Sequence, residues 1–386
     1  MIRALLKKHK LLFACLGVFL AWGITAQASD SDSLAHSKTA VEHGHRAEKE
    51  EFNAGKMIIK HIIDAHEWHI FTWKGHHVSI PLPVILIDKG NLVVFSSSHL
   101  HHGESYKGYK LEIEGPHKGK IIKVTSGEGL SESVTVPLDF SITKTVLSLF
   151  IGSLLLMLIF LSAAKRYKTN PNMAPRGIQS IVEPFILFIR DNLAIPAIGK
   201  KKYFKYMPYL LTVFFFIFLN NLLGLVPIFP GGVNLTGNLA ITMVLALFTF
   251  LITAFSGNRS YWTHIINTPG VPWWLKIPVP LMPVVEILGL ITKPFVLMVR
   301  LFANIAAGHI ILLGFMSLIF IFGSISPWLG VAVSPVSVIF GVFMTFLELL
   351  VAFIQAYVFT LLSAIYFGMA IEEHHHEHAS ESDNHH

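Results

Sequence analysis

The sequence predicts an all-α polytopic membrane protein with about five membrane helices, preceded by a small, β-containing N-terminal domain. The first observation is composition, because 53% of the 386 residues are hydrophobic and only 14% are charged. Soluble domains carry about 25% charged residues. The second is pattern: apolar runs long enough to cross a core of ~30 Å alternate with clusters of Lys and Arg. Basic loops beside membrane helices explain the net charge of +6 better than nucleic-acid binding does.

Residues 1–28 are expected to form a secretory signal peptide. A basic region precedes the apolar run Leu11–Ile24, and Ala26 and Ala28 supply the small residues of a cleavage site. The alternative is a retained first membrane helix, for which this run is short, because a normal span needs ~20 residues. Cleavage would remove Cys15, the single cysteine, and with it any disulfide or thiolate metal site.

The segment that follows is polar and then becomes more apolar. Residues 29–50 are expected to be disordered, and residues 51–139 to form a soluble domain. Within that domain the spacing of isoleucines predicts a helix over 57–69. Turn residues between short apolar runs predict one hairpin over 84–95 and a second over 111–124.

Residues 140–371 are the predicted membrane domain. Its first part contains three apolar runs of ordinary length for a membrane helix. They are Ile142–Ala164, Met207–Phe229 and Leu239–Phe255. Lysines and arginines after the first, before the second and after the third mark the cytoplasmic side. Residues 176–197 mix charged and apolar side chains, as an amphipathic helix at the membrane interface does.

Two further apolar runs, Ile277–Phe322 and Val331–Ala370, exceed a normal span. As straight helices they would extend about 69 and 60 Å at ~1.5 Å per residue, against a hydrocarbon core of ~30 Å. Each run therefore holds either two helices or one steeply tilted helix. Pro280, Pro283 and Pro294 permit breaks in the first run.

The first long run carries polar residues that need a reason, because an ionisable group costs roughly 2.5–3.5 kcal/mol at the bilayer centre. Glu286, Lys293 and Arg300 are seven residues apart, and Asn304 lies one turn further, so the four share one helix face. His309 falls near the opposite face.

The second long run repeats this pattern with Glu348 and Gln355, which are again seven residues apart. Buried polar groups need partners or water. The two helices are therefore expected to line an aqueous path, with the permanently charged Arg300 in the middle of it.

The residues that carry this polar pattern resemble a known family motif. The relevant runs are Arg300-Leu-Phe-Ala-Asn304-Ile-Ala-Ala-Gly308-His309, Phe353-Ile-Gln355-Ala-Tyr-Val-Phe359, the ending Ala364-Ile-Tyr-Phe-Gly-Met-Ala370, and Asn220-Asn221-Leu-Leu-Gly-Leu-Val-Pro227. Together they resemble subunit a of F-type ATP synthases over roughly residues 140–371. The first two runs on successive membrane helices are specific, whereas a lone membrane arginine would not be. The region 51–139 is longer than the family leads one to expect.

The resemblance implies a stationary proton channel whose two long, strongly tilted helices lie against a rotating ring of c subunits. Arg300 would face a carboxylate of that ring, favour its ionised form, and block a direct proton leak. Asn304 and Gln355 would help to place the arginine and its waters. The alternative for these two amides is a hydrogen bond that only joins two membrane helices.

His309 and Glu348 occupy, on this resemblance, two positions whose residues are exchanged between many bacterial members and the mitochondrial ones. A pair that can trade helices must be adjacent in space. The two side chains are therefore expected to form a shared proton-uptake site on the outer side. An imidazole that titrates near pH ~6.5 suits this role.

The resemblance also suggests residues for proton release. Glu286 and Lys293 would line a path to the cytoplasm, or else form an ion pair that steadies the helix. Asn220 and Asn221 are further candidate channel linings. No Gly-x-x-x-x-Gly-Lys-Ser/Thr loop occurs, so the chain would not be an enzyme on its own. No cofactor and no metal are expected in the channel.

The partners that the resemblance implies are the c-ring, subunit b of the stator stalk, the remainder of the ATP synthase complex and membrane lipid, with no nucleic acid. The chain would lie in a bacterial inner membrane. Residues 51–139 would face the periplasm, and the histidine-rich tail, residues 372–386, the cytoplasm.

Two rival functions remain open at this point. The first is a divalent-metal transporter that collects metal through the histidines of residues 51–139, such as His66 and His69. It needs paired ligands within the membrane helices, where the apolar runs offer His309 alone. The second is a binding or assembly module in which residues 51–139 do the main work.

Overall fold

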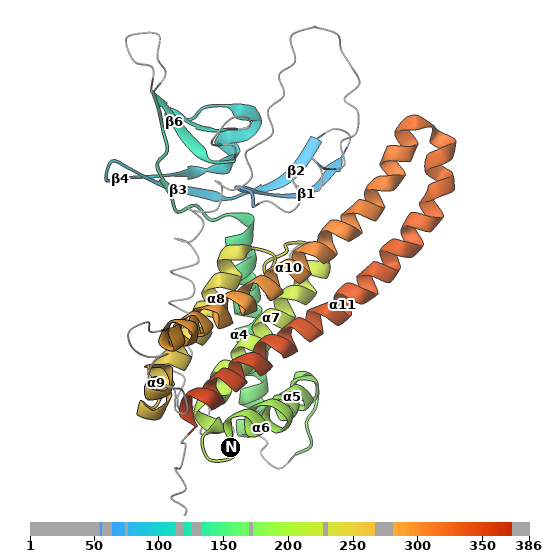
Figure 1. Ribbon diagram of the computed structural model, residues 1–386. Helices are drawn as coiled ribbons and strands as arrows, with labels where there is room; N and C mark the ends of the chain where they lie inside the picture. Colours follow the sequence, from blue (N-terminus) through green and yellow to red (C-terminus); the bar gives the residue numbers. More distant parts are fainter. Residues whose placement is uncertain are drawn as a thin grey trace, which may run out of the picture.

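The computed structural model describes residues 55, 64–73, 76–112, 117, 119–125, 133–169, 173–226, 231–266 and 281–372. Figure 1 shows a β-rich part at one end of a set of helices, and a long helical hairpin that crosses the others obliquely. The expected signal peptide, the segment 29–50 and all but the first residue of the tail 372–386 lie outside the described residues.

The β-rich part contains three small antiparallel sheets and one 3-10 helix. Its strands are β1 (Glu67–Trp73), β2 (His76–Pro81), β3 (Pro83–Asp88), β4 (Asn91–Ser96), β5 (Tyr109–Leu111), β6 (Ile121–Thr125), β7 (Ser133–Thr135) and β8 (Leu138–Asp139). The strand orders are β1-β2, β4-β3-β8 and β5-β6-β7. The 3-10 helix η2 (Ser97–Gly103) follows β4.

A compact apolar cluster holds the second and third sheets together. Val84 and Leu86 of β3 alternate with outward residues and are fully buried, and they pack with Phe95, Tyr109 and Ile121. This alternation is what a strand with one buried face requires. At one edge of the cluster, the Asp88 carboxylate accepts hydrogen bonds from Tyr109 at 3.0 Å and Lys123 at 2.5 Å.

The first predicted hairpin is confirmed. The predicted helix over 57–69 is wrong for residues 67–69, which form part of a strand. β3 pairs with β4 in register from Pro83–Ser96 to Asp88–Asn91, and Lys89 and Gly90 supply the positive φ angles of the turn. The second hairpin pairs β5 with β6. Residues 67–69 belong instead to β1, because their backbone pairs with β2. Residues 57–63 lie outside the described part.

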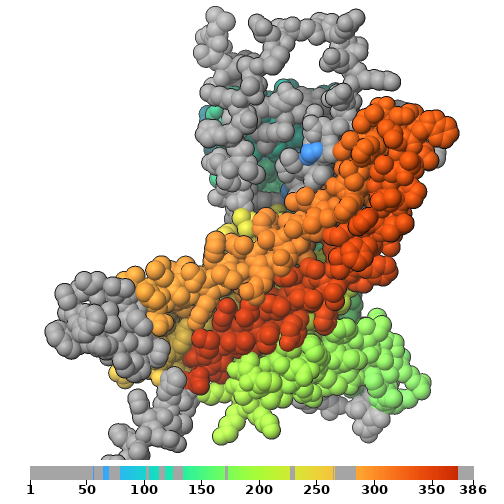
Figure 2. Space-filling model, turned by 45° about the vertical axis from the view of Figure 1, so that its right-hand side comes forward, coloured from blue at the N-terminus to red at the C-terminus, as the bar shows by residue number. Residues whose placement is uncertain are grey.

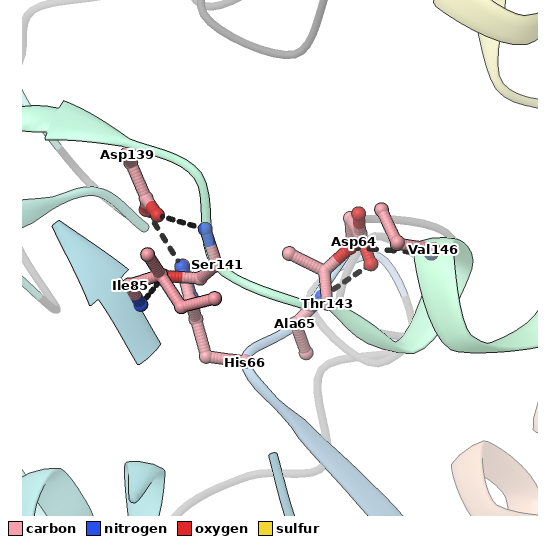
Figure 3. A network of polar contacts seen from close by, with 8 residues as sticks. All are labelled: Asp64, Ala65, His66, Ile85, Asp139, Ser141, Thr143 and Val146. Carbon is pink, nitrogen blue, oxygen red and sulfur yellow. Dashed lines mark hydrogen bonds and ion pairs between the residues drawn. The ribbon is translucent and has the colours of Figure 1, made fainter. Parts of the chain in front are cut away.

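A polar network joins the β-rich part to the first membrane helix, α4 (Lys144–Thr169) (Figure 3). The Asp64 carboxylate accepts a hydrogen bond from the backbone N–H of Thr145 at 3.1 Å, and so caps the helix from 81 residues away in sequence. His66 contacts Asp139 at 2.9 Å, and Asp139 also accepts from the Ser141 N–H at 2.8 Å. These bonds fix how the strand β8 enters α4.

After α4, the chain forms the elements of the interior of the helical part. They are α5 (Ile178–Phe188), the π-helical turn η3 (Ile189–Ala194), α6 (Ile195–Ile198), α7 (Tyr203–Leu225), α8 (Leu239–Ser256) and α9 (Arg259–Ile266). The phenylalanine-rich helix α7 is at the centre, with Phe214 and Ile217 fully buried. The segment α5–α6 lies across the ends of α4 and α7 (Figure 1), as an interface helix does.

The two long apolar runs each form one helix, α10 (Leu281–Ile325) and α11 (Pro327–Ile371), of 45 residues apiece. The alternative of two helices in each run is therefore wrong. Pro294 lies inside α10 without ending it, because neighbouring helices can compensate a missing hydrogen bond in a membrane helix. Pro327 stands in the first turn of α11, where a backbone N–H has no partner anyway.

Candidate functional site

The helices α10 and α11 form an antiparallel hairpin. Contacts between the two helices show where each polar residue lies along it. The close approach of Gly323 to Gly330 marks the tip. Below it, the rings of Phe315 and Phe340 stack at 5.2 Å. At the far end the Lys293 ammonium lies 5.7 Å from the ring of Tyr366. Arg300 therefore lies between the tip and the far end.

Arg300 stands on a face of α10 that no other part of the described chain covers. Its neighbours on that face include Phe295, which is 58% exposed, Val299 and Asn304. The guanidinium makes no hydrogen bond or ion pair with any residue that the structure describes. An arginine with five donors and a permanent charge in a largely apolar, outward-facing surface needs a partner beyond the described residues.

His309 and Glu348 meet across the hairpin, as the expected exchangeable pair must. The His309 Nδ1 lies against the Glu348 Oε1, and Glu348 is 4% exposed. Gly308 lies beneath this carboxylate, at 3.4 Å from where a side chain would begin. The second carboxylate oxygen of Glu348 has no hydrogen-bond partner among the described residues. A buried carboxylate with one free oxygen and one imidazole neighbour can accept and pass on a proton.

Gln355 and Asn221 are both buried within the chain. The Asn221 amide reaches the backbone carbonyl of Ala352, one turn before Gln355 on α11, at 3.5 Å. The Thr236 hydroxyl donates to the Asn221 side-chain oxygen. These contacts join α7, α11 and the segment before α8.

Asn220 faces α4 instead. Its amide nitrogen donates to the carbonyl of Phe216 at 2.7 Å, and its oxygen is buried without a partner among the described residues. Gly152 of α4 packs directly on that oxygen, and a Cβ at this position would overlap it. The geometry thus places Asn221 within reach of α11, and Asn220 in the α4–α7 contact.

Glu286 and Lys293 line one pocket at the other end of the hairpin. It has a volume of about 310 Å³ and is lined by Tyr261, Ile265, Glu286, Leu290, Lys293, Met369 and Glu372. No ion pair links Glu286 with Lys293 in this part of the described chain. The two side chains instead share an opening between α9, α10 and the end of α11.

Sequence reasoning missed three contributors to these sites. Gly308 packs against the side chain of Glu348, Tyr261 faces the pocket from α9, and Glu372 lines it from the end of α11. Gly308 stood inside the arginine motif, so its spacing from His309 could have drawn attention to it. Tyr261 and Glu372 carry no local signal, because only the packing of three distant segments brings them together. No group of three or more metal-ligand side chains occurs among the residues that the structure describes.

Comparison with known proteins agrees with this architecture. A family model described as ATP synthase A chain matches residues 146–368. ATP synthase subunit a of Myxococcus xanthus is 45% identical over 260 residues, which cover 64% of this chain and 80% of that protein. The subunit a of Chloroherpeton thalassium is 41% identical over 254 residues, covering 64% and 71%.

The fold and the matched residues define a membrane-embedded subunit of a rotary ATP synthase. The chain belongs to the ATP synthase subunit a family.

The N-terminal region has its own match. A domain of unknown function (DUF8433) covers residues 57–140. The subunit a of an Anaeromyxobacter species is 38% identical over 360 residues, which cover 90% of this chain and 76% of that protein. The similarity to this relative therefore extends through the β-rich region.

Proposed function

We propose that the chain is the stationary proton channel of the synthase and that Arg300 is its central charge, facing a carboxylate on a ring of c subunits. One observation carries this proposal: Arg300 lies on an outward, largely apolar face of α10 and has no ion-pair partner among the described residues. A ring acid moving past it would be held in its ionised form. A proton moving straight through would meet a fixed positive charge.

Proton uptake is assigned to the His309–Glu348 pair. The pair lies nearer the tip of the hairpin than Arg300, and its carboxylate is buried with one oxygen free. Such a group can take a proton from the outer side and deliver it towards the ring. Gln355, Asn221 and Asn304 would hold water beside this route, because their amides both donate and accept hydrogen bonds.

Proton release is assigned to the pocket that contains Glu286 and Lys293, with Tyr261 and Glu372 at its wall. This pocket lies on the opposite side of Arg300 from the uptake pair. Two half-paths separated by a fixed cation force each proton to travel on the ring. Each charge that crosses contributes about 2.3 kcal/mol per 100 mV of potential.

The basic residues support a sidedness. Lys165 and Arg166 lie near the end of α4, Lys200 follows α6, and Arg259 begins α9, and such clusters favour the cytoplasm. Figure 1 shows α6 and α9 at the end of the helical part away from the β-rich region. The β-rich region would then be periplasmic and the C-terminus cytoplasmic, in a bacterial inner membrane. The c-ring would contact α10 and α11, subunit b would hold the chain in place, and other subunits would handle ATP.

The experiment that tests the proposal is ATP-driven proton pumping in membrane vesicles that carry Arg300→Ala. Arg259→Ala is the matched control, because Arg259 is an exposed arginine on α9. We expect the Arg300 variant to assemble with the ring, as shown by blotting, and to lose both pumping and ATP synthesis. The control should keep both. Coupled transport in an assembled Arg300→Ala complex would refute the central role of this charge.

A further inference from the structure

An open depression lies where the turn after α6 meets the end of α11, on the basic end of the molecule. Its volume is about 760 Å³. Three consecutive lysines, residues 200–202, line one side, while Ile198, Ile365 and Met369 supply apolar surface. Figure 2 shows the yellow-green turn that follows α6 beside the red end of α11. The depression therefore combines positive charge with an apolar floor.

The three lysines have different tasks. The Lys202 ammonium donates to the backbone carbonyl of Ile371 at 3.2 Å and so helps to end α11. Lys200 and Lys201 are exposed and form no hydrogen bond or ion pair with the described residues. Glu372 is the one acidic residue in the lining. Among the described residues, two cations are thus left without a partner.

The shape of the depression is fixed by a backbone contact. Gly368 of α11 packs against the Ala197 carbonyl oxygen of α6, and a Cβ at this glycine would overlap that oxygen. Gly199 then turns the chain with a φ of +90° and sets the lysines on the rim. The lysines are therefore held at a defined distance from the apolar floor rather than on a free tail.

We propose that this depression binds an anionic phospholipid, with its phosphate on Lys200 and Lys201 and an acyl chain on Ile365 and Met369. The position supports a lipid ligand, because α5 next to it leaves Ile181 66% exposed, as a helix at the membrane interface does. Basic pockets between membrane helices on the cytoplasmic side suit such headgroups. The proposal is independent of the proton path.

The experiment counts phosphatidylglycerol retained by the full chain, taken from phosphatidylcholine bilayers that contain this lipid and measured by native mass spectrometry. The Lys200→Gln/Lys201→Gln variant is compared with Lys165→Gln/Lys168→Gln, which removes two exposed lysines outside the depression. A lysine at an anionic surface contributes about a fivefold gain in affinity, so we expect roughly 30-fold weaker retention in the first variant only.

A second variant and a competitor separate lipid from free phosphate. Ile365→Gln keeps both lysines and should still weaken phosphatidylglycerol retention severalfold, because an acyl chain then meets a polar floor. Inorganic phosphate at millimolar concentration should not displace the lipid. Equal losses in both lysine variants would overturn the site. Displacement by phosphate, or no effect of Ile365→Gln, would overturn the lipid as its ligand.

Discussion

The helices α7 and α10 have similar composition and opposite surroundings. In the most apolar stretch of α7, 56% of the residues are buried within the chain, whereas in α10 the share is 17% and in α11 it is 22%. Most side chains of α7 pack against α4, α8 and α11 inside the chain. The hairpin leaves a broad apolar surface that only lipid or another protein can cover.

The polar residues follow the same division. On α7, the Asn221 amide bonds to the Ala352 carbonyl and its oxygen accepts from Thr236. The Asn220 amide nitrogen donates to the Phe216 carbonyl, although the Asn220 oxygen has no partner among the described residues. Arg300 faces outward without a partner among the described residues, and the carboxylate of Glu348 is paired on one side only. A buried polar group that is satisfied stabilises a fold, and one that is left open is available for transfer chemistry. Substitutions on α7 should thus change stability, and those on the hairpin should change transport.

The largest effect is expected from Glu348→Gln. The amide keeps the shape of the side chain but cannot carry a proton from His309 onward, so proton pumping should fall at least ~100-fold. ATP-driven acidification of vesicles measures this effect. Glu183→Gln on α5, the same chemical change away from the hairpin, should leave pumping unchanged.

The exchange variant His309→Glu/Glu348→His sharpens this prediction. Since the two side chains touch across the hairpin, swapping them keeps one acid and one imidazole in the same place. We expect the exchange to recover a measurable part of the pumping that Glu348→Gln loses. An exchange variant as inactive as Glu348→Gln, in an assembled complex, would show that the pair does not act as one unit.

The next largest effect should come from Gly368→Ala at the packed end of α11. The added Cβ overlaps the Ala197 carbonyl oxygen, which is backbone and cannot turn away, so the free energy of unfolding should drop by roughly 1–3 kcal/mol. Gly289→Ala on α10 is the matched control, because its Cβ meets nothing within 4 Å. That change should stabilise the helix by about 0.5–1 kcal/mol.

Unfolding of the purified chain in mixed detergent micelles, followed by circular dichroism, measures both glycine variants. If both changed the free energy of unfolding by the same amount, the packed position on α11 and the open position on α10 would not differ as the structure shows.

The sequence allowed the helical architecture to be predicted well, and the contacts between segments only partly. Hydrophobic length located α4, α7 and α8, and the turn residues after Asp88 located the β3–β4 hairpin. The spacing of Ile58 to Ile63 suggested that a helix continues to His69, but pairing with β2 decides the structure of residues 67–69. Strand pairing depends on tertiary contacts, which the local spacing of hydrophobic residues does not reveal.

The candidate site shows the same limit. The residues on each helix and their seven-residue spacing were readable from the sequence, and the adjacency of His309 and Glu348 was expected from the resemblance to the family. The packing of Gly308 under Glu348, and the approach of Tyr261 and Glu372 to one pocket, depend on how α9, α10 and α11 cross. Crossing geometry is set by side chains from both partners of a contact.

A smaller effect is expected where the β-rich part meets α4. Asp64→Ala removes the carboxylate that caps the N-terminus of α4, and a lost cap costs about 1 kcal/mol. Hydrogen–deuterium exchange of the full chain should show faster exchange in the first turn of α4. Ser98→Ala, an exposed change in the same part of the molecule, should have no effect there. Unchanged protection in Asp64→Ala would mean that the cap does not hold the helix end.

The smallest effect tests whether the charged groups of the β-rich part are paired with one another. The hydrogen bond from Lys123, followed by that from Tyr109, lowers the pKa of the Asp88 carboxyl from its ordinary value of 3.8. A carboxyl whose pKa is lower when folded stabilises the fold above the unfolded pKa, and the gain is lost as pH falls through the folded pKa. The stabilisation should therefore be present above pH 3.8 and be lost progressively as the pH falls from there through the lower pKa of the folded state.

Lys123→Met should flatten this dependence, whereas Lys110→Met, which removes an exposed lysine from the neighbouring strand, should not. Protection of the β3 and β4 amides against exchange, compared between variants at each pH, measures the effect. If the two variants showed the same loss of protection on acidification, Asp88 would not depend on Lys123. The β-rich part would then resemble the hairpin, with charges left for a partner, rather than the self-contained interior around α7.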